Sequence, residues 1–185
     1  MTVAVGLLDG ERTAGLEEQL RMVLGEAFAE PPYGEGPVDV ERAFQRFRSQ
    51  VRRRGFRAAI AFDGDTVVGL AYGYPLSANT GWWDTLIDLV PSDLRHEDGK
   101  RTFGLFELAV RPGWRRQGVA TRMHRALVEG LDNARVMLNS RPEATAAQAA
   151  YLSWGYWRVS SAIPWEGAAR HDVMILDLLR PAPET

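Results

Sequence analysis

Hydrophobic and polar positions in the first part of the chain follow the periods of one strand and two helices. Apolar residues alternate with others over residues 3–7 and stop at Asp9-Gly10, which predicts a short strand followed by a turn. From Leu16 to Phe28 they recur every three or four residues, as on one face of a helix, and Pro31-Pro32 ends this pattern. Residues 40–51 repeat the helical period, so a second amphipathic helix is expected there.

A hairpin and a long connection are expected after the two helices. Residues 56–62 and 66–74 are strand-like runs separated by Asp63-Gly64-Asp65, where glycine accepts the positive φ of a tight turn. These two strands are therefore expected to pair antiparallel. The polar connection over residues 75–101 is long for a small domain, and connections of that length are generally functional or contain a short helix.

The second half of the chain predicts strands that alternate with helices. Residues 103–110 form an apolar strand that only Glu107 interrupts, and Arg111-Pro112-Gly113 breaks the pattern before the next helix. The remaining expected elements are helices over residues 119–131 and 144–154 and strands over residues 135–138, 157–161 and 173–179. This order of elements predicts a mixed α/β domain, with residues 181–185 as a frayed tail.

The composition is that of one ordinary globular domain. The chain has 185 residues, of which 45% are hydrophobic and 25% charged, which suggests a single domain over residues 1–185. The formal net charge of -2 leaves no global positive field to attract nucleic acid or an anionic membrane. The arginines of the second helix are interpreted as a solvated helix face; they are Arg42, Arg46, Arg48 and Arg52. Any anion that the protein binds must therefore be recognised locally.

Cysteine and histidine usage excludes several kinds of chemistry. The chain has no cysteine, which removes disulfides, thiolate metal clusters and cysteinyl acyl-enzymes. His96, His124 and His171 are widely separated and lack metal-binding spacing, so no metal site is expected. No apolar run approaches the roughly 18 residues of a membrane span, and acids interrupt residues 1–30, where a signal peptide would need an apolar region. We expect a cytoplasmic protein with no membrane partner.

The segment from Phe106 to Ala120 carries the most chemical information, because a strand there leads through a loop into a helix. The amides from Gln117 to Ala120 lie in the first helical turn and have no intrahelical acceptor. The helix dipole adds partial positive charge, and Gly118 lets a ligand come close to the backbone. These features favour a pyrophosphate pocket. The chain has no GxGxxG loop, and Gly99-Lys100 lacks the other residues of a P-loop.

This segment resembles the GNAT superfamily of acyl-CoA-dependent N-acyltransferases. The phosphate-loop pattern of that family is Arg or Gln, two residues, Gly, one residue, then Gly or Ala, and Arg115, Gly118 and Ala120 match it. Residues 107–110 are similar to the central strand of the family, whose backbone hydrogen-bonds the pantetheine arm. The resemblance implies a single-domain GNAT-like fold with a mixed, mostly antiparallel sheet of about seven strands flanked by about four helices. It also implies acetyl-CoA as co-substrate, in an opening where the sheet splays near the end of the central strand.

A second resemblance lies further along the chain. In the family, a helix that supplies Ala and Tyr ends in Gly, and Ala147, Tyr151 and Gly155 have these spacings. Ala144 departs from the pattern, because many relatives have Asn at this position. Asn139 would then have to replace the missing contact, or else the serine that follows it.

The two resemblances together cover about residues 103–160 and imply which residues contact the co-substrate. These contacts come from the strand backbone, from the loop and from the region after it. The implied residues are Leu108, Ala109, Val110, Arg115, Arg116, Gln117, Gly118, Val119, Ala120, Asn139 and Ala147.

Acetyl transfer to an amine needs a proton acceptor, because an alkylamine is mostly protonated at neutral pH and attacks a thioester only as the free base. Glu107, the lone acid of its apolar strand, is the candidate, since burial would raise the pKa of its carboxyl into the useful range. The alternative is a structural glutamate at a sheet edge or in a salt bridge. The resemblance gives Tyr151 the role of proton donor to the departing thiolate, unless its ring only packs under the helix. Because GxSxG and cysteine are both absent, we expect direct transfer in a ternary complex.

The acceptor is expected to be the primary amine of a small molecule, bound by the variable parts of the chain. The candidate contacts are aromatic and anionic residues that suit a cation, namely Tyr33, Trp82, Trp83 and Asp84. Alternatively, one of the two tryptophans anchors the 75–101 connection to the core. Two other functions stay open: an acyl-CoA-binding sensor without turnover, and a protein or peptide N-acetyltransferase. Relatives are often dimers, which leaves a homodimer open as well.

Overall fold

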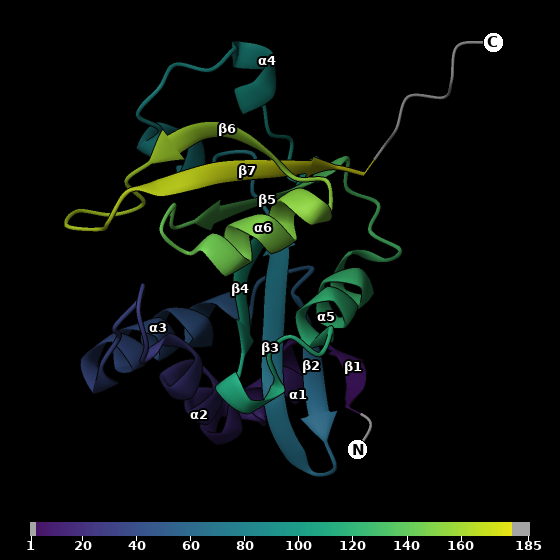
Figure 1. The fold of residues 1–185 in the computed structure, drawn as a ribbon. Helices are drawn as coiled ribbons and strands as arrows, with labels where there is room; N and C mark the ends of the chain where they lie inside the picture. The colour runs from purple at the N-terminus through teal and green to yellow at the C-terminus, as the bar shows by residue number, and fades with distance from the viewer. Residues whose placement is uncertain (1–2, 179–185) are drawn as a thin grey trace. The chain divides into compact units, whose positions relative to one another are not determined.

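The computed structural model describes residues 3–178, which form an α/β fold on one seven-stranded mixed sheet (Figure 1). The strand order in this sheet is β1-β2-β3-β4-β5-β7-β6. The described elements are β1 (Ala4–Leu8), α1 (Gly10–Ala14), α2 (Glu17–Phe28), α3 (Pro37–Gln50), β2 (Arg57–Asp63), β3 (Thr66–Pro75), the 3-10 helix η1 (Trp82–Thr85), α4 (Ser92–Arg95), β4 (Thr102–Val110), the 3-10 helix η2 (Pro112–Trp114), α5 (Val119–Val128), β5 (Arg135–Ser140), α6 (Thr145–Ser153), β6 (Trp157–Ala162) and β7 (His171–Asp177). None of the helices within residues 3–178 is long and apolar enough to cross a membrane.

The expected fold class and the seven strands are confirmed for the described residues, which contain six α-helices rather than about four. Helix α1 occupies the position where Asp9-Gly10 predicted a turn. The Asp9 carboxylate accepts a hydrogen bond from the Arg12 amide at 2.9 Å, so it caps a helix instead. Helix α4 lies inside the long connection. The expected last strand residue Leu179 and the expected tail, residues 181–185, lie outside the described residues.

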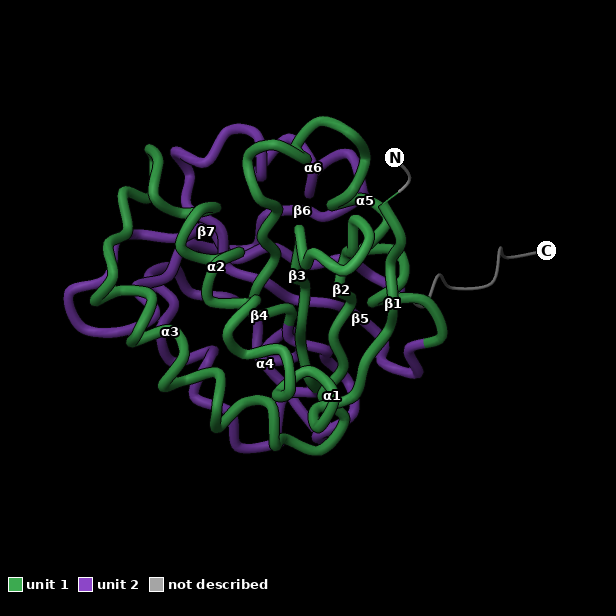
Figure 2. Tube along the Cα trace, turned by 90° about the horizontal axis from the view of Figure 1, so that it is seen from below, with its two compact units in different colours: residues 1–74, 105–130 green, residues 75–104, 131–185 purple. Residues whose placement is uncertain are grey.

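The chain divides into two compact units, residues 1–74 with 105–130 and residues 75–104 with 131–185 (Figure 2). In the first unit, β1 pairs antiparallel with β2, and β2 pairs antiparallel with β3. The turn between β2 and β3 contains Gly64 at a φ of 59°, as the Asp-Gly-Asp sequence predicted.

Helices α2 and α3 cover one face of the strands in the first unit. Ala58 and Ile60 on β2 join a buried cluster with residues of both helices, including Phe44 and Phe47, because alternate strand residues share a face. Helix α5 packs against β1 and β2. A side chain at Gly69 would lie within 3 Å of Met123 on α5, so this glycine allows the helix to approach β3 closely.

Ion pairs join α2 to α3 on the outside of the first unit. Arg48 on α3 binds Glu17 on α2 at 2.7 Å, and Arg21 on α2 binds Glu41 on α3 at 2.8 Å. Arg48 belongs to the arginine face that the sequence placed in solvent, and its side chain is half exposed. These pairs fix the two helices on either side of the loop over residues 29–36.

The second unit contains the long connection and the strands β5, β7 and β6. The first residues of β4 pair parallel with β5, and β7 pairs antiparallel with both β5 and β6. The connection pairs with β6, the strand at the end of the sheet. Leu86 forms a β-bridge with Ala162, and the Ile87 amide donates to the Ser161 carbonyl at 2.8 Å. The connection is therefore partly an extension of the sheet.

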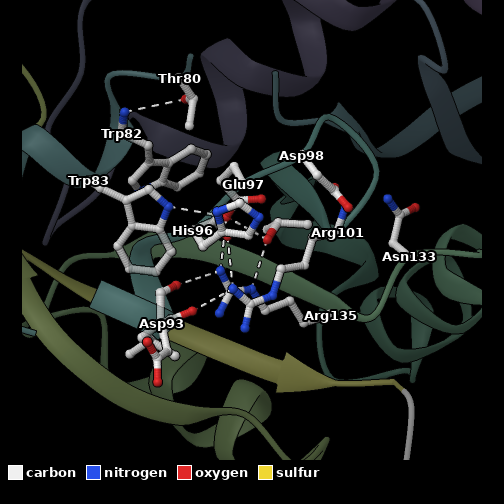
Figure 3. Close-up of polar contacts among 12 residues, drawn as sticks. Thr80, Trp82, Trp83, Asp93, His96, Glu97, Asp98, Arg101, Asn133 and Arg135 are labelled. Atoms are coloured by element: carbon white, nitrogen blue, oxygen red, sulfur yellow. Dashed lines mark hydrogen bonds and ion pairs between the residues drawn. The ribbon is translucent and has the colours of Figure 1, made fainter. Parts of the chain in front are cut away.

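A buried polar network anchors the connection to β4 and β5 (Figure 3). Glu97 Oε1 accepts hydrogen bonds from the Trp83 indole at 3.1 Å, from the Thr102 hydroxyl at 2.7 Å and from the Arg135 guanidinium at 2.9 Å. The same guanidinium donates to Thr102 Oγ1 at 2.7 Å and lies over the Trp83 ring. Trp83 is only 4% exposed, and its remaining surface lines a shallow depression next to Asp84. It anchors the connection, which was the alternative interpretation.

Removal of one member of this buried pair should destabilise the protein strongly. In Glu97→Leu the Arg135 charge stays buried without an anionic partner, so we expect the free energy of unfolding in urea to fall by about 3–5 kcal/mol. The double variant Glu97→Leu/Arg135→Met should recover most of that loss. The exposed pair of Asp84 with Arg95 is the control, because Asp84→Ala should cost less than about 1 kcal/mol. Equal losses from Glu97→Leu and Asp84→Ala would contradict this account.

Candidate active site

The loop between β4 and α5 is fixed by its own side chains, which bond to other elements of the first unit rather than to the amides of the loop. The Arg111 guanidinium binds both carboxylate oxygens of Glu26 on α2, at 2.8 and 2.6 Å. The Trp114 indole donates to Asp63 at the end of β2, at 3.0 Å. The Arg115 guanidinium donates to the carbonyl of Ala27 at 2.7 Å and to a carbonyl at the end of β4. These contacts fix the loop on α2 and on the β2–β3 hairpin.

Two residues of this loop have left-handed backbone conformations. Arg116 has a φ of 60°, and Gly118, the residue that precedes α5, has a φ of 73°. Left-handed residues at such a turn bring successive amide N–H groups onto one concave side, which is a common way of binding anions. Gly118 is needed for its conformation and not for space, because no atom lies within 4 Å of the position where its Cβ would be.

The amide groups that follow the turn remain available to a ligand. Among residues 3–178, no acceptor takes a hydrogen bond from the N–H groups of residues 116–121, whereas the Arg122 amide already donates to the Gly118 carbonyl at 3.1 Å. Residues 115–118 are exposed. The ten-residue helix α5 adds the positive end of its dipole at the same place. The sequence-predicted residues Arg116, Gln117, Gly118, Val119 and Ala120 thus form a row of unbonded amide donors, of which the first three belong to exposed residues, and this arrangement suits a diphosphate.

Arg115, which the sequence pattern assigned to the cofactor, has a structural role in the described contacts. Besides its bonds to the Ala27 and Val110 carbonyls, its guanidinium lies 3.5 Å from the Glu30 carboxylate. Its side chain therefore holds the loop in place. The Ala109 side chain is buried in the core of the first unit, so only the backbone of this residue is left for a ligand.

Glu107 is a half-buried carboxylic acid in the middle of β4. Desolvation raises the pKa of its carboxyl to about 8, and the negative charge of Glu35 adds to the rise. Arg46 on α3 and a hydrogen bond from the Leu108 amide act in the opposite direction without cancelling the rise. A carboxyl with this pKa exchanges its proton near neutral pH, as a general base requires.

Glu35 and Tyr72 interact electrostatically with Glu107, and Gln50 contacts Tyr72, but none of the three was singled out from the sequence. The Tyr72 hydroxyl is buried and donates to Gln50 Oε1 at 2.8 Å, and the nearby charge of Glu107 helps to raise the pKa of Tyr72, behind the larger effect of burial. A weak signal for Tyr72 was present, since it is a hydroxyl-bearing residue in the apolar run of β3. No local pattern marks Gln50, because the contact joins residues 22 positions apart.

Tyr151 and the other predicted residues of the second unit lie on α6 and β5. Tyr151 is 7% exposed, and its ring meets those of Trp154 and Tyr156 edge to face, each at 5.6 Å between centroids. Ala147 lies on the same helix and is half-buried. Asn139 on β5 uses its side-chain oxygen to accept a hydrogen bond from the Trp82 indole at 3.1 Å. Asn139, which was predicted to contact the cofactor, and Trp82, which was predicted to contact the acceptor, are thus direct neighbours.

The remaining acceptor candidates are at least partly exposed. Asp84 is exposed and pairs with Arg95 at 3.2 Å, beside a shallow depression. Tyr33, in the loop after α2, is half-buried and packs edge to face on Phe28. Over residues 3–178, no group of three or more acidic or histidine side chains is arranged to hold a metal ion.

Comparisons with known proteins agree with this fold and loop. A model of the acetyltransferase (GNAT) family matches residues 21–156, and the chain therefore belongs to the GNAT acetyltransferase family. No curated protein sequence matches the chain significantly.

Solved structures share the fold at low sequence identity. The ribosomal-protein-S18-alanine N-acetyltransferase from Escherichia coli is 17% identical, with a TM-score of 0.66 over 100% of this chain and 99% of that chain. The PaiA N-acetyltransferase from Thermoplasma acidophilum, in complex with coenzyme A, is 12% identical, with a TM-score of 0.64 over 96% and 99%. An aminoglycoside 6'-acetyltransferase type Ii is 17% identical, with a TM-score of 0.65 over 97% and 99%. One of these enzymes is named for a ribosomal protein and another for an aminoglycoside, so the likeness establishes the fold and not the acceptor.

The raised pKa of Glu107 should make stability depend on pH. The folded state keeps the carboxyl proton up to about pH 8, whereas the unfolded chain releases it near the ordinary value of 4.5. This contribution is therefore complete below about pH 4.5 and is lost as the pH rises to 8, with a slope of at most about 1.4 kcal/mol per pH unit. Denaturant unfolding from pH 5 to 9 should show this loss for the unmodified protein relative to Glu107→Gln. Parallel stability curves for the two proteins would refute the raised pKa.

Proposed function

We propose that the protein transfers an acetyl group from acetyl-CoA to the primary amine of a small molecule, by direct transfer in a ternary complex. The observation that carries this proposal is the row of unbonded amides over residues 116–121, which includes the N-terminus of α5. Membership of the GNAT acetyltransferase family supplies the reaction class. The two compact units are proposed to act together as one acyltransferase domain.

Acetyl-CoA is proposed to bind through its diphosphate to the amides of residues 116–120. The backbone of Leu108, Ala109 and Val110 would hydrogen-bond the pantetheine arm. Asn139 and Ala147 are also proposed as contacts of the coenzyme, as the family resemblance implies. When bound, the coenzyme supplies an activated acetyl thioester. A coenzyme A complex of a protein with the same fold supports this choice of ligand.

Glu107 is proposed to accept the proton of the attacking amine, directly or through one water molecule. An ammonium ion that approaches this carboxyl favours its ionised form, since an opposite charge lowers the pKa of a carboxyl group. The raised pKa of about 8 makes the ionised form a better proton acceptor than an ordinary exposed glutamate. The backbone N–H groups of β4 would stabilise the oxyanion of the tetrahedral adduct.

Tyr151 is proposed to donate a proton to the departing thiolate. A phenol is a suitable donor because it keeps its proton at neutral pH. The rings of Trp154 and Tyr156 hold the Tyr151 ring from two directions, which supports a fixed position for its hydroxyl. The acceptor itself is proposed to be bound by Tyr33, Trp82, Trp83 and Asp84, of which Trp83 and Asp84 line the same depression.

Release of free thiol from acetyl-CoA in the presence of a panel of amines tests the proposed function. We expect turnover with at least one small primary amine and little with peptides that carry a free N-terminus. Binding of acetyl-CoA without thiol release for any acceptor would instead favour a sensor. Turnover with peptides alone would favour a protein or peptide N-acetyltransferase.

Two variants separate the proposed chemical roles from binding. Glu107→Gln and Tyr151→Phe should each reduce kcat by on the order of 10²-fold or more, since each removes one proton transfer. The affinity for acetyl-CoA, measured by calorimetry, should stay within a factor of a few of the unmodified protein. A variant with unchanged kcat would remove that residue from the mechanism.

Replacement of Gly118 should weaken coenzyme binding. In Gly118→Ala the left-handed conformation at a φ of 73° costs about 1–2 kcal/mol, and the added methyl group lies beside the open amides. We therefore expect at least about a tenfold loss of coenzyme A affinity by calorimetry. Gly113→Ala is the matched control, because Gly113 lies in the same loop without a positive φ and also has open space around its Cβ position. Similar affinities of the two variants would argue against the amide site.

A further inference from the structure

A bulge in β6 turns two of its polar side chains to the same side of the sheet. Strand β6 pairs antiparallel with β7 (Figure 1), and the register shifts between Arg158 and Ser160, so that an extra residue of β6 is inserted there. Successive residues of a regular strand point to opposite faces, so positions three apart do not normally share a face. The extra residue removes this mismatch, and Arg158 Nη2 donates to the Ser161 hydroxyl at 2.6 Å.

The Ser161 hydroxyl receives more hydrogen bonds than its oxygen can accept. Besides Arg158, the Nε and Nη2 atoms of Arg170 both point at this oxygen, at 2.9 and 2.6 Å. A hydroxyl oxygen has two lone pairs, so these N–H groups cannot all be satisfied there. Ser161 is 0% exposed, and within residues 3–178 no acceptor takes its own hydroxyl proton. Hydrogen-bond donors are therefore in excess at this point of the structure.

The same cluster carries an excess of positive charge. Arg158 binds Asp172 on β7 at 2.7 Å, whereas Arg170 forms no ion pair with any residue in the described range 3–178. Two guanidinium groups and one carboxylate leave one positive charge without a partner. Arg158 and Arg170 are both exposed, so an anion can reach them from solvent.

The geometry of these donors suits a carboxylate. A guanidinium group forms its strongest contacts when two parallel N–H bonds reach two oxygens, and Arg170 directs two donors at a single oxygen instead. A carboxylate offers two oxygens and one negative charge, which matches both the fork of Arg170 and the unbalanced charge. A phosphate dianion would exceed that charge.

The cluster adjoins the segment that carries Trp82 and Asp84, two of the proposed acceptor contacts. The Ile87 amide donates to the Ser161 carbonyl at 2.8 Å, which joins this segment to β6. The Thr85 hydroxyl donates to the Trp82 carbonyl at 2.7 Å, which fixes the start of the segment. The arginine cluster is therefore placed to hold an anionic group of a molecule that contacts this segment.

We propose that Arg158, Arg170 and Ser161 bind a carboxylate, and that the acetyl acceptor is an amine that also carries a carboxylate group. The second part rests on the proposed function, whereas carboxylate binding does not. A purely structural role, in which the two arginines only hold β6 against β7, predicts no carboxylate binding. The two roles can therefore be separated by experiment.

Butanoate, a carboxylate without an amine, tests the site without turnover. It should shift the side-chain Nε–H signals of Arg158 and Arg170 in nitrogen NMR spectra, with the signals assigned from Arg→Gln variants. Arg170→Gln should weaken butanoate binding by at least about tenfold, because it removes charge-assisted hydrogen bonds. Arg170→Lys should also weaken it, since a point charge does not replace the fork. Arg54→Gln removes one exposed charge from the first unit and should leave the affinity unchanged.

Matched pairs of acceptors connect the site with the acetyl transfer. Amino acids of increasing length, from glycine to 6-aminohexanoate, are each compared with the alkylamine that has the same number of carbon atoms. At one length or more, kcat/KM for thiol release should be at least about tenfold higher for the amino acid. Arg170→Gln should remove this preference mainly through KM and leave kcat/KM for the alkylamine unchanged, because the lost contact binds the substrate and the transition state alike.

Failure of this proposal and failure of the proposed function give different results. If butanoate shifts neither arginine signal, or binds as tightly to Arg170→Gln, the carboxylate site is overturned, while thiol release with alkylamines would still support the transferase. Tighter binding of inorganic phosphate than of butanoate would overturn the assignment to a carboxylate. Equal use of amino acids and alkylamines at every length would overturn the acceptor class. Absence of thiol release with every amine, while butanoate still binds through Arg170, would overturn the proposed function and support the site. Thermal unfolding of each variant identifies any loss that comes from misfolding.

Discussion

The open amides over residues 116–121 are the groups on which the proposed function depends, and their availability is imposed by the surrounding contacts. A loop rich in arginine and glutamine has many side chains that could fold back onto its own amides. Here Arg111 binds Glu26, Trp114 binds Asp63, and Arg115 binds main-chain carbonyls. The side chains that fix the loop thus leave its backbone donors unoccupied, and the site is preorganised before a ligand arrives.

The left-handed turn and the helix start would favour the proposed diphosphate in two different ways. The turn at Arg116 and Gly118 sets the direction of individual N–H groups, which gives geometric selectivity. The start of α5 adds a partial positive charge that does not depend on any side chain. A protein with a net charge of -2 can therefore bind a dianionic group without a basic surface. The arginines of the loop are accordingly used to hold it in place: Arg111 binds Glu26, and Arg115 binds the Ala27 carbonyl.

The sequence predicted the fold well where the information is local. Period-two and helical patterns located every strand, and the Asp-Gly-Asp turn located the hairpin, because burial on one face dictates these patterns. The loop was found because its amides lie where a helix must begin after an apolar strand. The Asp9 cap was missed because Asp-Gly favours a turn and an N-cap about equally from sequence alone.

Contacts between distant positions explain what sequence reasoning could not resolve. Trp82 and Trp83 are adjacent and chemically identical, yet their partners, Asn139 and Glu97, lie 57 and 14 positions away. Those partners decide that Trp83 is an anchor and that Trp82 stays partly exposed. The arginine pattern had the same limit, because a short motif identifies Arg115 but does not show whether its guanidinium faces a ligand or the carbonyl of Ala27.

Residues 107–121 combine two opposite requirements for hydrogen-bond donors. A diphosphate needs many donors, and the end of this segment supplies a row of unbonded amides. A general base that works near neutral pH needs few, because every donor to a carboxylate lowers its pKa. At Glu107 the described donor is the Leu108 amide, and desolvation outweighs its effect. The two requirements can be met by neighbouring parts of the chain because most of β4 is buried, which keeps water and other donors away from it. Residues 115–118 of the loop are exposed instead, and the side chains that fix the loop bond to α2 and to the β2–β3 hairpin.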